Sequence, residues 1–232
     1  KAVTTGAYNT LLGGLAGDAL TAGSNNVAIG YAALSTEDAH GKNIAIGASA
    51  LLSLDAGADA YNVAIGDQAG KMLSTGHDNV LVGGKAGDAL TTGSDNVAIG
   101  KNALNTETEY GRNVAVGKSA LNTQNAGSNA YNVAIGYEAG LYITTGVQNT
   151  IIGGLAGDAL TTGQRSVAVG YLALSSETGS DRSVAIGTEA LKNQNVGSSN
   201  AYNVAVGDSA GEEITTGTYN NIIGGLAGDA LT

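Results

Sequence analysis

The sequence predicts an all-β fold, a parallel β-solenoid, because one eight-residue box recurs at short, regular intervals along the chain. The box reads Asn, two variable residues, an aliphatic residue, Gly, two more residues and Ala, as in NVAIGYAA at 26–33. Its fifth residue is Gly and its eighth is Ala in every copy. We expect each copy to open one coil of 17–20 residues, stacked on the coil before it. Thirteen copies begin at Asn9, Asn26, Asn43, Asn62, Asn79, Asn96, Asn113, Asn132, Asn149, Ser166, Ser183, Asn203 and Asn220.

A longer repeat groups the coils into super-repeats of four. The phrase GGLAGDAL begins at Gly13, Gly153 and Gly224, and GGKAGDAL begins at Gly83, so these phrases lie 70 or 71 residues apart. The residue after the box Ala follows the same rhythm, because it reads Gly, Leu, Leu and Gly in successive coils. The extra residues of each super-repeat fall in its third coil, which predicts a wider loop on one edge of every fourth coil.

Each coil is expected to contain two short parallel strands joined by two turns. Val27 and Ile29 should point to one face of the box strand and Ala28 to the other, because side chains alternate along a strand. Gly30 follows where the chain must bend and a neighbouring backbone comes close. Helices are not expected, since Gly recurs too often for them. The second strand is predicted near the aliphatic residues that follow the box, such as Leu20, Leu73, Leu90 and Ile143.

The first residue of the box predicts a ladder of polar side chains. Stacking places each Asn above the Asn of the previous coil, where its side chain can hydrogen-bond along the stack. Ser166 and Ser183 are the replacements, and Ser also makes short side-chain hydrogen bonds. The alternative is that Asn merely suits a turn. We assign to this structural ladder Asn26, Asn43, Asn62, Asn79, Asn96, Asn113 and Asn132, with Gly30, Gly47, Gly66 and Gly100 at the corner.

The composition excludes several classes of protein. There are 37 Gly and no Pro, Cys, Trp or Phe, so the interior must be thin and a disulfide framework or a thiolate metal site is excluded. The net charge of −10 argues against nucleic acid and anionic membranes as partners. No apolar run approaches the roughly 20 residues of a membrane span. We expect residues 1–232 to form a single solenoid segment, and a chain that begins at Lys1 inside a coil to be an excerpt from a longer fibrous protein.

A thin coil needs a second source of stability. Each ordered residue costs about 1.5 kcal/mol of conformational entropy, which small side chains offset poorly. Either a metal at each turn or the packing of several chains around an axis could supply it, and we expect a homotrimer. Small residues on one face of the box strand should allow the close approach of neighbouring chains. These residues are Ala28, Ala64, Ala98 and Ala134.

Three other classes of protein share parts of this pattern. GGLAGDALT resembles the calcium-binding nonapeptide of repeat toxins, but its aspartates Asp18, Asp88, Asp158 and Asp229 are four coils apart, whereas calcium rolls need the motif in adjacent turns. The alternative for Asp18 is a hydrogen-bond acceptor in a tight turn. An ice-binding rod would need Thr at matching sites in every coil, and pairs such as Thr91–Thr92 are interrupted by the Leu coils.

The third class is the hexapeptide-repeat acyltransferases. One unit of their repeat fits Ile29, Gly30 and Ala33, but Ser35 stands where the next aliphatic residue belongs. A catalytic His would also be expected, and the two histidines, His40 and His77, both lie in expected turns. We therefore predict no enzyme, and assign no catalytic, cofactor-binding or metal-binding residue.

The repeated NVAIGxxA box with a TTG-type turn resembles the head repeats of trimeric autotransporter adhesins and the related repeats of bacteriophage tail fibres. The resemblance covers essentially the whole chain. It implies a trimeric, left-handed parallel β-roll, extracellular or on a virion, that holds or forms an adhesive surface. Adhesin heads usually have shorter coils, and the regular 70-residue super-repeat is closer to a fibre. The choice between the two stays open.

Six tyrosines are candidates for an adhesive surface that binds a glycan or protein of a host. Tyrosine is favoured in protein contacts. The alternative is that an exposed Tyr simply packs on its cross-strand neighbour. Three of the six follow the box Gly and three lie in the wide loops of the third coils. They are Tyr31, Tyr137 and Tyr171, and Tyr61, Tyr131 and Tyr202, respectively.

Overall fold

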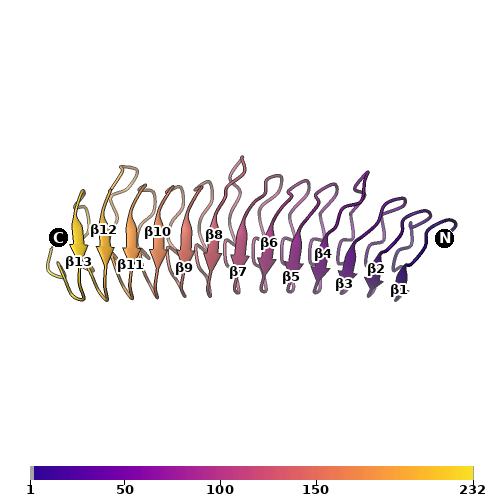
Figure 1. The fold of residues 1–232 in the computed structure, drawn as a ribbon, viewed down its shortest axis with the longest axis horizontal. Helices are drawn as coiled ribbons and strands as arrows, with labels where there is room; N and C mark the ends of the chain where they lie inside the picture. The colour runs from indigo at the N-terminus through magenta and orange to yellow at the C-terminus, as the bar shows by residue number, and fades with distance from the viewer. Residues whose placement is uncertain (1–2, 232) are drawn as a thin grey trace. The chain divides into compact units, whose positions relative to one another are not determined.

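The computed structural model describes residues 3–231, and each coil contains one three-residue strand (Figure 1). These residues fall into two compact units, of which the first ends at Asn113 and the second begins at Val114. The first unit holds β1 (Thr10–Leu12), β2 (Val27–Ile29), β3 (Ile44–Ile46), β4 (Val63–Ile65), β5 (Val80–Val82) and β6 (Val97–Ile99). The second holds β7 (Val114–Val116), β8 (Val133–Ile135), β9 (Thr150–Ile152), β10 (Val167–Val169), β11 (Val184–Ile186), β12 (Val204–Val206) and β13 (Asn221–Ile223).

Within each unit, every strand lies beside the next strand of the chain and runs parallel to it (Figure 1). The pairing matches the boxes residue by residue, so that Ala28 of β2 lies opposite Ala45 of β3. This register holds across the wider third coils, where Ala45 pairs with Ala64 of β4. The prediction of an all-β parallel β-solenoid with about 17 residues in each turn is therefore confirmed. Among residues 3–231, no helix has the length and apolar character needed to cross a membrane.

The second strand predicted in each coil is absent from the described residues. Leu90 is fully buried, as a core residue should be, but it lies outside any strand. Its N–H donates back to the carbonyl of Gly87 in the same coil at 3.2 Å, whereas the N–H of Ala89 donates to Asn105 in the next coil at 3.1 Å. Because bonds within a coil alternate with bonds between coils, no continuous ladder can form on this side. The equivalent residues Leu20, Leu73 and Ile143 are also buried outside strands.

The box strand keeps its small side chain inside the coil and its two larger ones outside. Ala28, Ala64, Ala98 and Ala134 have no solvent exposure, so the prediction that they face a neighbouring chain is wrong. The flanking side chains are part-exposed, with Ile65 and Ile99 at 38%. Both faces of a Val-Ala-Ile strand are apolar, which is why alternation alone could not assign them. The thin interior admits Ala, and the β-branched residues are left outside.

The side chains at two interior positions of the coil vary in size from one coil to the next. Two coils of each super-repeat place Ala in the middle of the strand and Leu after the box Ala, as in Ala98 and Leu104, both fully buried. In every fourth coil the strand carries a large residue instead, such as Leu81 of β5. A Cβ at Gly70 of the preceding coil would lie 2.7 Å from Leu81 Cδ1, so Leu81 fills the space that the missing side chain leaves. The four-coil repeat of the sequence therefore reflects how side chains of successive coils pack in the interior.

Candidate functional site

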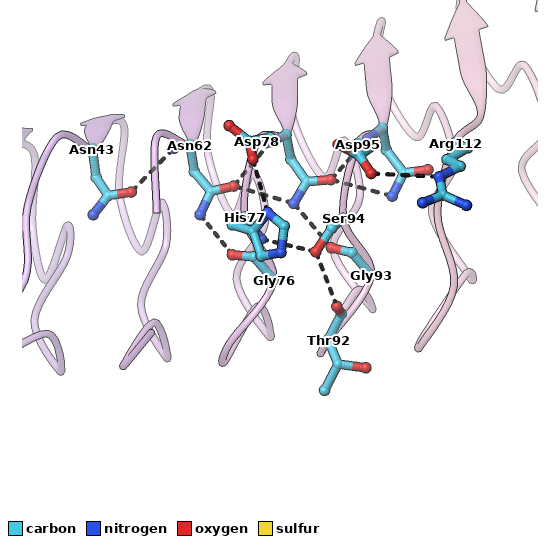
Figure 2. Close-up of polar contacts among 12 residues, drawn as sticks. Asn43, Asn62, Gly76, His77, Asp78, Thr92, Gly93, Ser94, Asp95 and Arg112 are labelled. Atoms are coloured by element: carbon cyan, nitrogen blue, oxygen red, sulfur yellow. Dashed lines mark hydrogen bonds and ion pairs between the residues drawn. The ribbon is translucent and has the colours of Figure 1, made fainter. Parts of the chain in front are cut away.

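The conserved first position of the box forms a chain of hydrogen bonds through the buried edge of the first unit (Figure 2). The side-chain oxygen of each Asn accepts from the backbone N–H of the next Asn, at 3.1 Å from Asn43 to Asn62 and 3.0 Å from Asn62 to Asn79. The side-chain nitrogen of Asn62 donates to the carbonyl of Gly76 at 2.8 Å, near the end of the same coil. The amide of Asn62 therefore links the two ends of its own coil to the start of the next. The predicted members Asn26, Asn43, Asn62, Asn79, Asn96, Asn113 and Asn132 are all fully buried.

Direct bonds between Asn side chains occur along part of this ladder. Asn79 Nδ2 donates to Asn62 Oδ1 at 3.1 Å, and Asn96 Nδ2 donates to Asn79 Oδ1 at 3.2 Å. In the second unit Ser continues the chain, because Ser166 Oγ accepts from the N–H of Ser183 at 3.4 Å. We call the hydrogen bonds by which one Asn side chain links the end of its coil to the next coil the asparagine clasp. Serine lacks the amide nitrogen that makes the bond across the turn, so it forms fewer of these hydrogen bonds. The arrangement is structural, since buried amides that are fully bonded have no group left for a ligand.

The box glycines form a corner at which successive backbones are in contact. Gly30, Gly47, Gly66 and Gly100 have φ between 131° and 140°, a region that residues with a Cβ rarely adopt. A Cβ on Gly30 would lie 2.5 Å from the carbonyl oxygen of Gly47, and one on Gly66 would lie 2.5 Å from the carbonyl carbon of Gly83. Glycine is thus required at this corner both by the backbone angle and by the close approach of the next coil.

The six candidate tyrosines do not form one surface. All are exposed, from 40% for Tyr202 to 63% for Tyr31. Tyr31 follows the end of β2, whereas Tyr61 precedes the start of β4. Because the strands of each unit are parallel, the two groups lie at opposite ends of the strands within that unit. The sequence therefore found exposed aromatic side chains, but these belong to two separate rows.

Tyrosines of the wide-loop row pair with cations of the preceding coil. Lys42 Nζ donates to the hydroxyl of Tyr61 at 2.7 Å and lies 2.9 Å from Asp59 Oδ2. These contacts raise the pKa of Lys42 above its usual range, with the Tyr61 bond the larger cause and Asp59 the next. In the second unit, Arg182 lies over the ring of Tyr202 at 5.6 Å. These rings are held by their own chain, as the packing alternative for Tyr expects.

The residues that suggested calcium binding and those that suggested ice binding differ in their surroundings. Among residues 3–231, one carboxylate oxygen each of Asp88 and Asp158 is buried without a hydrogen-bond partner. Burial raises the pKa of Asp158, and the charge of Glu138 adds to this shift. The hydroxyl groups of Thr91 and Thr161 donate to carbonyl oxygens of the next coil at 2.8 Å, which turns them away from a flat outer surface.

His77 lies beside an acid and a hydroxyl, but the three groups are not arranged for catalysis (Figure 2). His77 Nδ1 is 2.8 Å from Asp78 Oδ2. The hydroxyl of Ser94 accepts from the backbone N–H of His77 at 3.1 Å and donates to the carbonyl of Thr92 at 3.4 Å. Its proton is directed to the backbone and not to the imidazole, so this cluster lacks the nucleophile-to-base bond that a triad needs.

Sequence analysis missed a set of buried glutamates. Glu37, Glu107 and Glu177 have no solvent exposure, although glutamate is rarely fully buried. Glu177 Oε1 accepts from the N–H groups of Thr178 at 2.9 Å and Ser180 at 3.0 Å. The carboxylate thus orders the turn of its own coil. The available signal was the 70-residue spacing of these glutamates, at a position where most other coils carry Leu, Ile or Gln.

A second omission was the aliphatic outer face. We use this name for the side chains of the second and fourth box residues, which point outward from the strands of each unit. In β2–β6 these residues are all Val or Ile, and each is part-exposed or exposed.

Comparisons with protein-family models, with curated proteins and with solved structures found no match to this chain.

Proposed function

We propose that this chain is a non-enzymatic structural segment of an extracellular fibre, in which three copies associate through their outer faces. The outer face is the observation that carries this proposal. Val27, Ile29, Ile44 and Ile46 begin a row of apolar side chains that repeats at every strand from β2 to β6. Contiguous apolar surface of this kind marks an interface with another molecule.

The parallel pairing of the strands strengthens the argument. Parallel sheets generally have both faces covered. Here the inner face packs on the coil interior, where Ala45 and Ala64 are fully buried. The outer face is not covered by its own chain, as the 38% exposure of Ile65 shows. Covering it would bury Val and Ile side chains, each of which contributes about 1.5–3 kcal/mol when fully buried.

The repeat itself favours another copy of the chain as the partner. Outward side chains recur at each strand, and neighbouring parallel strands lie about 4.8 Å apart. A partner must present apolar groups at the same interval to remain in contact along such a face. A second and third copy meet this condition at every coil, because their outer faces have the same period. Closed cyclic symmetry also leaves no face of this kind exposed.

The adhesive part of the proposal rests on the exposed tyrosines and on the resemblance to adhesin heads and phage tail fibres. Tyr31 and Tyr171 project beyond the ends of the strands and are 63% and 53% exposed. They offer contact area for a glycan or protein of a host surface, on a cell surface or on a virion. The net charge of −10 disfavours nucleic acid as a partner.

Sedimentation equilibrium of the purified chain in the presence of a chelator tests the association. We expect a mass three times that of one chain. Ile65→Lys places a charge on the outer face and should shift the protein towards monomer. Tyr31→Lys introduces the same residue at an exposed site beyond the face, and should leave the trimer intact.

Two results would contradict the proposal. One is a folded, stable wild-type monomer under these conditions. The other is an Ile65→Lys variant that remains trimeric with unchanged melting temperature, because a lysine cannot be buried at an apolar interface without cost.

A further inference from the structure

Four potential metal ligands meet beside the second and third coils of the first unit. Glu37, Asp38 and His40 come from the turn between β2 and β3, and Asp55 comes from the loop between β3 and β4. One ligand atom from each side chain lies within 4.8 Å of those of the other three. Glu37 is fully buried, His40 is part-exposed, and Asp38 and Asp55 are exposed. The cluster therefore has a buried base and an open side.

The buried carboxylate of this cluster has fewer donors than its counterpart in the third super-repeat. Glu177 accepts from three successive backbone N–H groups through Oε1, and from Gln194 Nε2 at 3.1 Å through Oε2. In residues 3–231, Glu37 accepts hydrogen bonds from the N–H groups of His40 and Ala56 alone, at 2.9 and 3.2 Å. Leu54 stands at the position of Gln194 and offers no donor. Glu37 is a buried carboxyl group with capacity for a further positive partner.

The imidazole of His40 is directed at this carboxylate. His40 Nδ1 lies 3.4 Å from Glu37 Oε1, and this nitrogen is buried without a hydrogen-bond partner among the described residues. A buried ring nitrogen left without a hydrogen bond is unusual, since buried polar atoms are nearly always bonded. Neutral imidazole nitrogen is also the commonest metal ligand that proteins use. A cation between His40 Nδ1 and Glu37 would satisfy both groups.

The super-repeats show that these ligands are particular to the first one. Glu occurs at this position in all three, as Glu37, Glu107 and Glu177. The other three ligands are replaced by residues of a different chemistry. In the second super-repeat their places are taken by Thr108, Tyr110 and Asn125, and in the third by Thr178, Ser180 and Asn195. Three separate positions thus carry a ligand in the same super-repeat, which is the one that lacks the Gln donor.

We propose that Glu37, Asp38, His40 and Asp55 bind one divalent transition-metal ion of the Zn²⁺ type. A set of one imidazole and three carboxylates suits Zn²⁺, which accepts nitrogen and oxygen ligands in four-coordinate sites. Ca²⁺ prefers oxygen ligands alone, in higher number. The ion would join the turn of the second coil to the wide loop of the third, and so fasten neighbouring coils at an edge where Leu54 has removed a hydrogen bond.

Calorimetric titration of the untagged 232-residue chain with Zn²⁺ tests this site. We expect about one ion to bind per chain, with affinity reduced at least about tenfold in His40→Ser, Asp38→Thr and Asp55→Asn. These substitutions introduce the residues that the third super-repeat carries at the same positions, so the coil accommodates them. Their melting temperatures without metal report whether the fold is kept. Zn²⁺ should raise the melting temperature of the wild type and not that of His40→Ser.

His77→Thr is the matched control, because His77 also lies beside an acid and Thr218 occupies the equivalent place in the third super-repeat. It should bind Zn²⁺ as the wild type does. The proposal is overturned if the wild type does not bind Zn²⁺ at submillimolar concentration, or if His40→Ser binds it equally well. Loss of binding in His77→Thr, or tighter binding of Ca²⁺ than of Zn²⁺ by the wild type, would also overturn it.

Discussion

The side chain of Leu81 occupies the space that a side chain at Gly87 would need. A Cβ on Gly87 would lie only 2.9 Å from Leu81 Cδ2. The next coil solves the same packing problem in the opposite way, with Ala98 in the strand and Leu104 after the box. Leu104 takes the same left-handed backbone conformation as Gly87, with φ of 49° against 57°. A large side chain can therefore occupy either position, but Leu81 and a large side chain at residue 87 would compete for the same space.

This relationship predicts strong coupling between the two residues. Leu81→Ala should lower the free energy of unfolding by about 2–5 kcal/mol, because it leaves a cavity in a fully buried site. Gly87→Leu should also destabilise the fold, because the core has no room for a second large side chain. A Cβ at Gly87 would also lie 2.8 Å from Leu90 Cδ1. The double variant combines Ala, Leu and Leu as in the coil of Ala45, Leu51 and Leu54, all fully buried. It should therefore be more stable, by about 1 kcal/mol or more, than the sum of the two single effects predicts. Chemical denaturation measures the free energy of unfolding of the wild type, the two single variants and the double variant. If the effects of the two substitutions simply add, the two side chains do not share one space.

The glycine corner gives a second prediction. Gly83 has φ of 132°, and a Cβ there would lie 2.6 Å from the carbonyl carbon and oxygen of Gly100. Gly83→Ala should therefore lower the free energy of unfolding by more than about 2 kcal/mol, from backbone strain and displacement of the next coil. Lys101→Ala, at an exposed site in the adjacent coil, should change it by less than about 0.5 kcal/mol. Equal melting temperatures for the two variants would show that the corner tolerates a side chain.

The part-buried Asp158 of the third super-repeat predicts a dependence of stability on pH. Burial raises the pKa of Asp158, so the folded state binds a proton over a pH range in which the unfolded state has lost it. Stability contributed by this group is thus present below the unfolded pKa of about 3.9 and is lost as pH rises through the folded value. Asp158→Asn carries no charge and should be more stable than the wild type at pH 7.

The difference between Asp158→Asn and the wild type should shrink as the pH is lowered towards 3. Thermal melting across this range measures it. Asp67→Asn, at an exposed position, controls for the removal of one negative charge. An Asp158→Asn variant that is less stable than the wild type at pH 7 would mean that the ionised carboxylate is needed in the fold.

The coil boundaries could be predicted from the sequence because backbone contact imposes a residue type on them. Gly66 is required by its angle and its neighbour, and Asn62 by two buried bonds, so both recur at a fixed spacing. The second strand was predicted wrongly because the aliphatic residues on that side, such as Leu90, report burial alone. Burial does not determine whether the N–H groups bond within the coil or to the next coil.

The candidate sites were less predictable for a related reason. An acidic residue in a polar stretch, such as Glu37, suggests an exposed turn, and its burial depends on backbone donors that no side-chain pattern reveals. The proximity of His40 to Asp55 also depends on the stacking of two coils of unequal length. The inward orientation of Ala45 follows from the limited volume of the coil, which a period of two does not express.

The asparagine clasp has a consequence for how the chain reaches its folded state. Asn62 closes its coil by binding Gly76 and the N–H of Asn79, which lie 14 and 17 residues later in the chain. This clasp can therefore form once the start of the next coil has been synthesised, and it requires no residue further along the chain. The acceptor that receives a new coil is always on the coil made just before it. A nascent chain of this sequence can acquire its structure from the N-terminal end, one turn at a time, at the pace of translation.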